Sequence, residues 1–290
     1  MGRAGRKLAG AAVGVILVDR QELFYPMIFK RKSFHLFKEI GQISAEELSD
    51  IQEAYKTFIP LVGEIRTGIR IVPGDQTTCK RGQEYCILLY SEKKEHYLQN
   101  IGYLGEQLDL YLASNNIGAL WFGIGKTEQK SYDGMDFVIM IAIAKMPADK
   151  FRKDMFKSKR KPLAEIWQED GVWEMCGSER GREERDGGKA YGQLIGNIVR
   201  FAPSACNTQP WIAKAEAGKL SVCRYKKPGK RGIMPADKVV YYNRIDIGIF
   251  LLFLELCFAH EGISFERKLF ADAADEAEMV LTAEYHITSI

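Results

Sequence analysis

The stretch Arg200-Phe-Ala-Pro-Ser-Ala-Cys-Asn-Thr-Gln-Pro-Trp211 follows a helical pattern and gathers hydrogen-bonding side chains in a short loop. Pro203 ends the helix, because proline has no N–H and disfavours helical geometry in the residue before it. Ser204, Ala205 and Asn207 then form the loop, and Gln209 leads into an extended segment. The spacing alone is typical of a helix-to-strand turn. So many donors and acceptors in one loop also favour a site for a flat ligand rich in heteroatoms.

The composition excludes several classes of function. The chain has 290 residues, 46% hydrophobic and 27% charged, which is ordinary for a globular protein. Its net charge is only +3 and no basic stripe carries interleaved aromatics, so we expect no nucleic-acid partner. The six cysteines form no C-x-x-C pair and the four histidines have no ligand spacing, so we expect no metal site and a cytoplasmic protein.

The first 26 residues form an expected N-terminal extension that the fold can do without. Basic residues precede an apolar run over residues 8–18, which loosely imitates a signal peptide. Asp19 and Arg20 close the run without a cleavage motif, and the run is too short to span a bilayer. We therefore expect no membrane association.

Hydrophobic periodicity divides the rest of the chain into two halves, residues 27–168 and 191–290. The first half predicts a helix with a Ser44/Glu47 capping box and a second helix that Gly118 ends. Its helices and strands are expected at residues 45–58, 85–90, 95–115, 119–122 and 137–144. The polar, glycine-rich residues 169–190 are expected to form a linker. The second half predicts elements at residues 191–201, 211–216, 220–225, 245–261, from 263, and 279–286.

A faint internal repeat relates the two halves. Asn100-Ile-Gly102 opens the first long helix, and Asp246-Ile-Gly248 opens the second. Each helix is followed by a glycine and a strand. The repeat favours two related half-domains.

The loop motif A-P-S-A-x-N-x-Q-P-W resembles the signature loop of the FMN-dependent nitroreductase family. The resemblance covers roughly residues 27–290 with gaps, and Ala202–Trp211 is its most specific element. It implies an α+β, nitroreductase-like fold with a mixed central sheet flanked by helices. It also implies that Pro203, Ser204, Ala205, Asn207 and Gln209 bind FMN.

Two basic clusters resemble the phosphate-binding motifs of that family. Arg31-Lys-Ser-Phe-His35 is similar to its R-R-S-x-R start, although His35 stands where Arg or Lys is usual. The segment around Lys159 and Arg160 is similar to its R-K-P-L motif. Taken alone, both clusters would be solvated turns. The resemblance implies that Arg31, Lys32, Ser33, His35, Lys159 and Arg160 hold the FMN phosphate.

Trp121-Phe-Gly-Ile-Gly125 resembles the family segment that places a backbone N–H against the flavin ring. By position Gly123 carries that role, and Ile124 replaces the second glycine. Taken alone, this glycine pair would be a strand-end turn.

The phosphate motif lies only in the first half and the signature loop only in the second. Residues 57–63, at the matching place in the first half, have neither the Ser nor the Asn. The chain therefore resembles fused nitroreductases in which two unequal half-domains of one polypeptide mimic the usual dimer. One flavin site is retained in that arrangement, and a monomer is plausible.

No catalytic constellation of side chains stands out, which fits chemistry carried by a cofactor. The resemblance implies an oxidoreductase that passes hydride from NADH or NADPH through FMN to a small acceptor, such as a nitroaromatic or a quinone. Two alternatives remain open. One is a non-catalytic flavin-binding or sensor module, and the other is a scaffold that has lost the cofactor.

Overall fold

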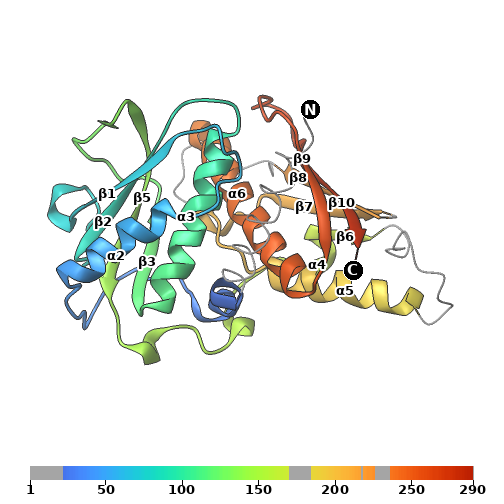
Figure 1. The fold of residues 1–290 in the computed structure, drawn as a ribbon, viewed down its shortest axis with the longest axis horizontal. Helices are drawn as coiled ribbons and strands as arrows, with labels where there is room; N and C mark the ends of the chain where they lie inside the picture. Colours follow the sequence, from blue (N-terminus) through green and yellow to red (C-terminus); the bar gives the residue numbers. More distant parts are fainter. Residues whose placement is uncertain (1–21, 170–183, 217, 226–235, 290) are drawn as a thin grey trace, which may run out of the picture.

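The structure is a computed structural model that describes residues 22–169, 184–216, 218–225 and 236–289. Two separate five-stranded sheets lie on opposite sides of a central helix pair (Figure 1). The first sheet has the order β1-β2-β5-β3, and the short β4 pairs with β5. Its strands are β1 Thr67–Pro73, β2 Tyr85–Ser91, β3 Ile117–Phe122, β4 Ser131–Tyr132 and β5 Met135–Lys145.

The second sheet repeats this order as β7-β8-β10-β9 and adds β6 at its edge. Its strands are β6 Trp167–Glu169, β7 Trp211–Glu216, β8 Lys219–Tyr225, β9 Ser264–Leu269 and β10 Met279–Ser289. The neighbouring strands of both sheets are antiparallel, except that β6 and β7 are parallel. The α+β class with helices flanking mixed strands is thus confirmed, although each half has its own sheet.

The helices also correspond between the halves. In each half a helix precedes two antiparallel strands, and a long helix then leads to the remaining strands, which are β3, β4 and β5 in the first half and β9 and β10 in the second. The preceding helices are α2 Ala45–Lys56 and α5 Glu184–Val199, and the long helices are α3 Tyr97–Ser114 and α6 Ala236–His260. In the centre, α3 and α6 pack on each other and carry most of the contact between the halves.

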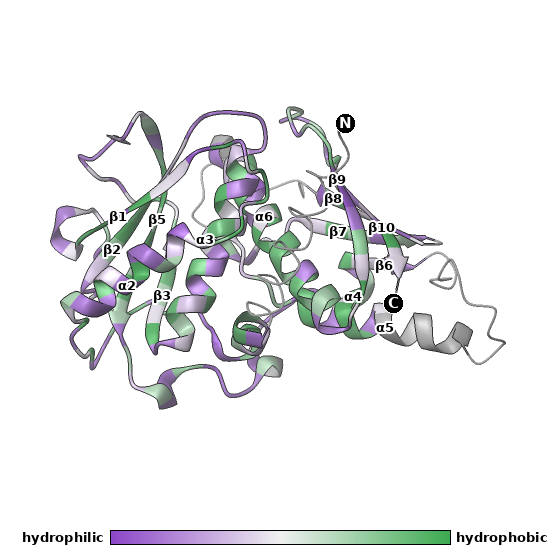
Figure 2. Cartoon of the chain, in the orientation of Figure 1, coloured by the Kyte–Doolittle hydropathy of each residue, from purple (hydrophilic) through white to green (hydrophobic). Residues whose placement is uncertain are grey.

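The core is built around α3 and α6, which are covered by other elements from several sides. Apolar residues gather along α6 and the inner strands (Figure 2). Trp211 at the start of β7 is fully buried and stacks on Phe250 of α6 with ring centroids 5.0 Å apart. Burying an aromatic pair of this size stabilises the fold by several kcal/mol, on the order of 3–5. The tryptophan that follows the signature loop therefore fixes where that loop ends.

The capping box at the start of α2 is confirmed. The Ser44 hydroxyl accepts from the Glu47 N–H at 3.1 Å, and the Glu47 carboxylate accepts from the Ser44 N–H at 3.0 Å. These bonds satisfy two donors that the first helical turn leaves free. The prediction for Gly118 is wrong, since α3 ends at Ser114 and Gly118 lies inside β3. A Cβ there would meet Phe34 and Met146, so close packing requires the glycine.

Three predicted boundaries also differ. Residues 22–30 form a helix whose Phe24 and Ile28 are buried in the core, so the limit expected at residue 26 falls inside this helix. Residues 1–21 lie outside the described part of the chain. Helix α5 begins at Glu184, within the expected linker, whose residues 170–183 are likewise not described. Helix α6 begins at Ala236, before the predicted Ile245.

Candidate functional site

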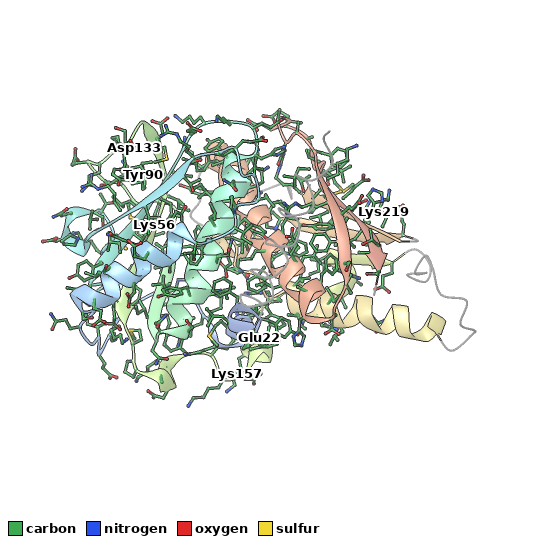
Figure 3. All side chains as sticks on the ribbon, in the orientation of Figure 1. Glu22, Lys56, Tyr90, Asp133, Lys157 and Lys219 are labelled. Atoms are coloured by element: carbon green, nitrogen blue, oxygen red, sulfur yellow. The ribbon has the colours of Figure 1, made fainter. Side chains whose placement is uncertain are left out.

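A cavity of about 930 Å³ lies between the two halves. Its walls come from residues 31–35, the end of β3, residues 149–160, the signature loop and α6. Figure 3 shows Lys157, one of the lining residues, on the lower side of the molecule between the halves. The cavity brings together all but one of the predicted site residues, namely Arg31, Lys32, Ser33, His35, Gly123, Ile124, Lys159, Arg160, Pro203, Ser204, Ala205 and Asn207.

The exception is Gln209, which is buried behind the loop and does not line the cavity. Its backbone N–H donates to the Ser204 hydroxyl at 2.9 Å, and its amide oxygen accepts from the Lys161 N–H at 2.8 Å. Gln209 therefore ties both ends of the signature loop to residues 159–161. The structure gives it a positioning role.

The signature loop has a backbone that few residue types adopt readily. Cys206, Asn207 and Gln209 have φ values of 50°, 54° and 47°. Such left-handed geometry costs on the order of 1 kcal/mol or more for a residue with a side chain, and it persists only where the surroundings impose it. The bonds of Gln209 are part of what imposes it here.

Arg160 and Asn207 join the second basic cluster to the loop. The Arg160 guanidinium donates to the Asn207 amide oxygen at 3.1 Å and to the Phe201 carbonyl at 3.1 Å. In return the Asn207 amide donates to the Lys159 carbonyl at 3.1 Å. The two motifs are 48 residues apart in sequence yet form one rigid wall of the cavity.

Arg31 lines the cavity, but its guanidinium is already bonded to α3. Its Nη2 donates to Asp109 at 2.9 Å and to the Ser33 hydroxyl at 3.4 Å, and its Nε lies 3.7 Å from Glu106. All three charged side chains are almost completely buried. Burial raises the pKa of both carboxyl groups, and the positive charge of Arg31 opposes that rise. Arg31 therefore serves first as the counter-ion of two buried acids.

Arg152 is a site residue that the sequence analysis missed. It lines the cavity, and burial together with the nearby charges of Arg31 and Arg160 lowers its pKa to about 10. The pKa of Arg160 is also lowered to about 10, by burial and by Arg31 and Arg200. Among the described residues, the buried Arg152 Nη1 and Arg160 Nε have no hydrogen-bond partner. This wall holds positive charge and free donors that an anion would satisfy.

Tyr242 of α6 is a second missed residue. Its hydroxyl donates to the Gly123 carbonyl at the end of β3, which links the two halves. A Cβ on residue 123 would lie 2.7 Å from the Tyr242 ring, so this contact requires the glycine. Ile124 follows with 49% of its surface exposed and lines the cavity rim. No local sequence signal pairs residues 119 positions apart.

The corresponding place on the other side of the helix pair holds a hydrogen-bonded cluster of side chains, Tyr103, Glu255 and Arg267. Tyr103 follows Gly102 as Ile249 follows Gly248, and Ile249 lines the cavity. The Tyr103 hydroxyl donates to Glu255 at 2.9 Å, and Arg267 donates to the same carboxylate at 2.5 Å and to the Leu61 carbonyl at 3.0 Å. The Tyr103 ring and the Arg267–Glu255 ion pair therefore stand where the cavity has the aliphatic side chain of Ile249.

Within the described ranges no group of three His, Cys, Asp or Glu side chains could hold a metal ion. None of the helices in that part of the chain combines the length and the apolar character needed to cross a membrane.

Residues 24–175 match the family model described as "Putative TM nitroreductase". The match spans more than half of the chain, so the chain belongs to this family. None of the curated proteins matches the sequence.

Solved structures show where the likeness lies. A "putative nitroreductase" from Thermotoga maritima is 16% identical with a TM-score of 0.55, over 92% of this chain and 94% of that chain. It shares the fold. A nitroreductase family protein from Clostridium difficile is 11% identical with a TM-score of 0.37, over 52% of this chain and 94% of its own. A "Putative NADH dehydrogenase/NAD(P)H nitroreductase" from Parabacteroides distasonis is 13% identical with a TM-score of 0.36, over 47% and 93%.

Proposed function

We propose that the protein is an FMN-dependent oxidoreductase of the nitroreductase type. It takes hydride from NADH or NADPH and reduces a small acceptor such as a nitroaromatic or a quinone. The observation that carries the proposal is the cavity between the halves, which gathers all the predicted cofactor-binding residues except Gln209. Membership of the nitroreductase family supports it.

The chemistry of the cavity fits FMN. Its volume falls within the range of about 300–1,000 Å³ that is usual for ligand sites. One wall offers the free guanidinium donors of Arg152 and Arg160 to a phosphate. Another wall is aliphatic and aromatic, as a flat ring requires, and includes Leu120, Ile245 and Ile249. One wall would thus bind the anionic part of the ligand, and another would bind its apolar part.

Each part of the protein then has a task. Arg152 and Arg160 bind the phosphate, with Lys159 beside them, and Arg31, which is bonded to Asp109 of α3, adds a positive charge nearby. The backbone at Gly123 and the polar groups of the signature loop orient the ring. FMN, when bound, supplies the hydride chemistry. The protein contributes binding, orientation and the exclusion of water.

We further propose that the single chain mimics the dimer of ordinary nitroreductases and binds one flavin as a cytoplasmic monomer. The repeated strand order of the two sheets supports this. The counterpart cluster also supports it, because Tyr103 and Arg267 both bond to Glu255 at that place. Its acceptor is a small molecule, and neither nucleic acid nor membrane is a partner.

A second candidate is a flavin-binding or sensor module without turnover. Two departures from the family pattern favour it, the exposed Ile124 at the cavity rim and His35 in the phosphate motif. Rapid mixing of the flavin-loaded protein with NADH or NADPH separates the two functions. An enzyme bleaches its flavin quickly, whereas a module that only binds does so slowly or not at all.

The decisive experiment is to purify the protein, record a visible spectrum and titrate it anaerobically with NADH and NADPH. We expect a yellow protein whose flavin absorbance is lost on titration. A colourless protein that takes up no flavin when FMN is added would overturn the proposal.

A further inference from the structure

Asp246 is a buried acid in the cavity wall, and one of its oxygens has no hydrogen-bond partner among the described residues. It lies on α6, lines the cavity and is only 3% exposed. Its Oδ1 accepts from the Ala205 N–H of the signature loop at 3.0 Å. Its Oδ2 is buried and has no hydrogen-bond partner among the described residues. A buried polar atom without a partner is costly, so this oxygen marks a place where a ligand is expected.

The other half of the chain shows which kind of side chain is enough to make the loop contact that Oδ1 of Asp246 makes. Asn100 stands two residues before Gly102, as Asp246 stands two residues before Gly248. The Asn100 amide oxygen accepts from the Val62 N–H at 3.1 Å, which is the same contact to the corresponding loop. An amide therefore suffices to hold such a loop, although its Nδ2 is also buried without a hydrogen-bond partner among the described residues. An acid occurs only in the half where the side chain lines the cavity.

We propose that Asp246 keeps a proton on Oδ2 and donates a hydrogen bond to an uncharged acceptor atom of the cavity ligand. For a flavin, such an atom is a ring carbonyl oxygen or a ring nitrogen. The proposal rests on the proposed function. It adds to that function a titratable hydrogen-bond donor, the Asp246 side chain, at the edge of the ligand. A neutral acid acts as a donor here, whereas a carboxylate would repel the lone pair of the acceptor.

The surroundings favour the protonated form. Burial raises the pKa of Asp246 well above its usual range, and the bond from the Ala205 N–H opposes this rise only in part. The titratable neighbours are Cys206 on the loop, Tyr242 on α6, Glu106 on α3, and the charged side chains of residues 31–35 and 149–160. Burial is the larger influence on the pKa of Asp246, and the backbone bond is the smaller one.

The test compares FMN affinity from pH 6 to 9 in the wild-type protein, Asp246→Asn and Asp246→Ala. The wild-type protein should lose affinity as the pH rises, by roughly tenfold for one lost hydrogen bond. Asp246→Asn should bind tightly without that loss, because its amide keeps both the loop contact and a donor. Asp246→Ala should bind roughly tenfold more weakly at all pH values.

FMN phosphate titrates in all three proteins, so differences between the variants isolate Asp246. Asp149→Asn is the matched control, since Asp149 is an exposed acid that lines the same cavity. It should keep the wild-type dependence on pH. Identical pH profiles for the wild-type protein and Asp246→Asn would overturn the proposal.

A measurement without ligand separates this inference from the proposed function. Because the folded state raises the pKa of Asp246, its contribution to stability is lost as the pH rises through the folded pKa. The melting temperature of the wild-type protein should fall over that range relative to that of Asp246→Asn. A constant difference would show that Asp246 holds no proton. A wild-type protein that binds no FMN would instead contradict the proposed function.

Discussion

Gly102 of α3 and Gly248 of α6 meet in a reciprocal contact at the centre of the molecule. A Cβ on Gly102 would lie 2.0 Å from the carbonyl oxygen of Ile245, and a Cβ on Gly248 would lie 1.9 Å from that of Gln99. Each of these carbonyls stands three residues before the glycine of its own helix. The two helices therefore cross in a nearly symmetric way, and backbone touches backbone there.

We predict that Gly102→Ala and Gly248→Ala each destabilise the protein by about 3 kcal/mol, because a methyl group has no space between the two backbones. Denaturant unfolding measures this loss. Gly63→Ala is the control, since its Cβ would meet nothing within 4 Å. It should change the free energy of unfolding by less than about 1 kcal/mol. Equal effects of all three substitutions would refute the crossing as described.

This crossing shows what the sequence could and could not predict. The two Ile-Gly pairs were visible as a repeat, but a repeat does not reveal which atoms approach. The strongly apolar segments were located well, because burial on several sides leaves a clear pattern. β1 was missed because its side chains are mostly half-exposed, and β6 because it has only three residues.

The same holds for the site. Local motifs were enough to find the signature loop and its basic partners, which the cavity unites. Arg152, Tyr242 and Asp246 were missed because only the tertiary fold brings them to those motifs. The segment after Tyr225 was also too polar to show that α6 begins at Ala236, nine residues before the predicted start at Ile245.

Arg152→Ala should weaken FMN binding by roughly tenfold to a hundredfold, the loss of one charged hydrogen bond. Riboflavin, which lacks the phosphate, should bind the variant and the wild-type protein equally. Arg152→Lys, which keeps the charge, should have an intermediate effect. Calorimetric titration with both flavins measures the difference. A comparable loss of riboflavin affinity would place Arg152 at the ring instead of the phosphate.

Arg31→Ala should mainly destabilise the fold, by about 3–5 kcal/mol, because it leaves two buried acids without their counter-ion. The loss should shrink as the pH falls, since protonation of Glu106 and Asp109 removes the uncompensated charge. Unfolding by denaturant at several pH values tests both statements. A variant as stable as the wild-type protein would mean that Arg31 is reserved for the ligand.

Tyr242→Phe should cost about 1 kcal/mol of stability, because it removes the hydroxyl bond to Gly123 that joins the halves. Tyr132→Phe on the exposed β4 is the control and should have no measurable effect. Thermal unfolding compares the two variants. Equal melting temperatures for both would contradict the inter-half role of Tyr242.

The protein should bind one FMN per chain, because Tyr103, Glu255 and Arg267 fill the counterpart of the cavity. Mass measurement of the intact protein under native conditions gives the ratio directly. A second flavin on each chain would show that this cluster opens. Asn207→Ala alters the cavity and leaves its counterpart unchanged. The same measurement on this variant should show the number of FMN molecules per chain falling from one toward zero.

The parallel pairing of β6 with β7 has a consequence for how the molecule comes apart. Trp167 and its neighbours end the first half of the chain, yet they complete the sheet of the second half. If the backbone were cut between β6 and α5, the amino-terminal piece would retain a strand whose partners belong to the other piece. The two pieces would then be complementary fragments that should reassemble when mixed, because the carboxy-terminal piece lacks the edge strand of its sheet. The pairing of β6 with β7 would then hold the two pieces together even where the backbone between them is cut.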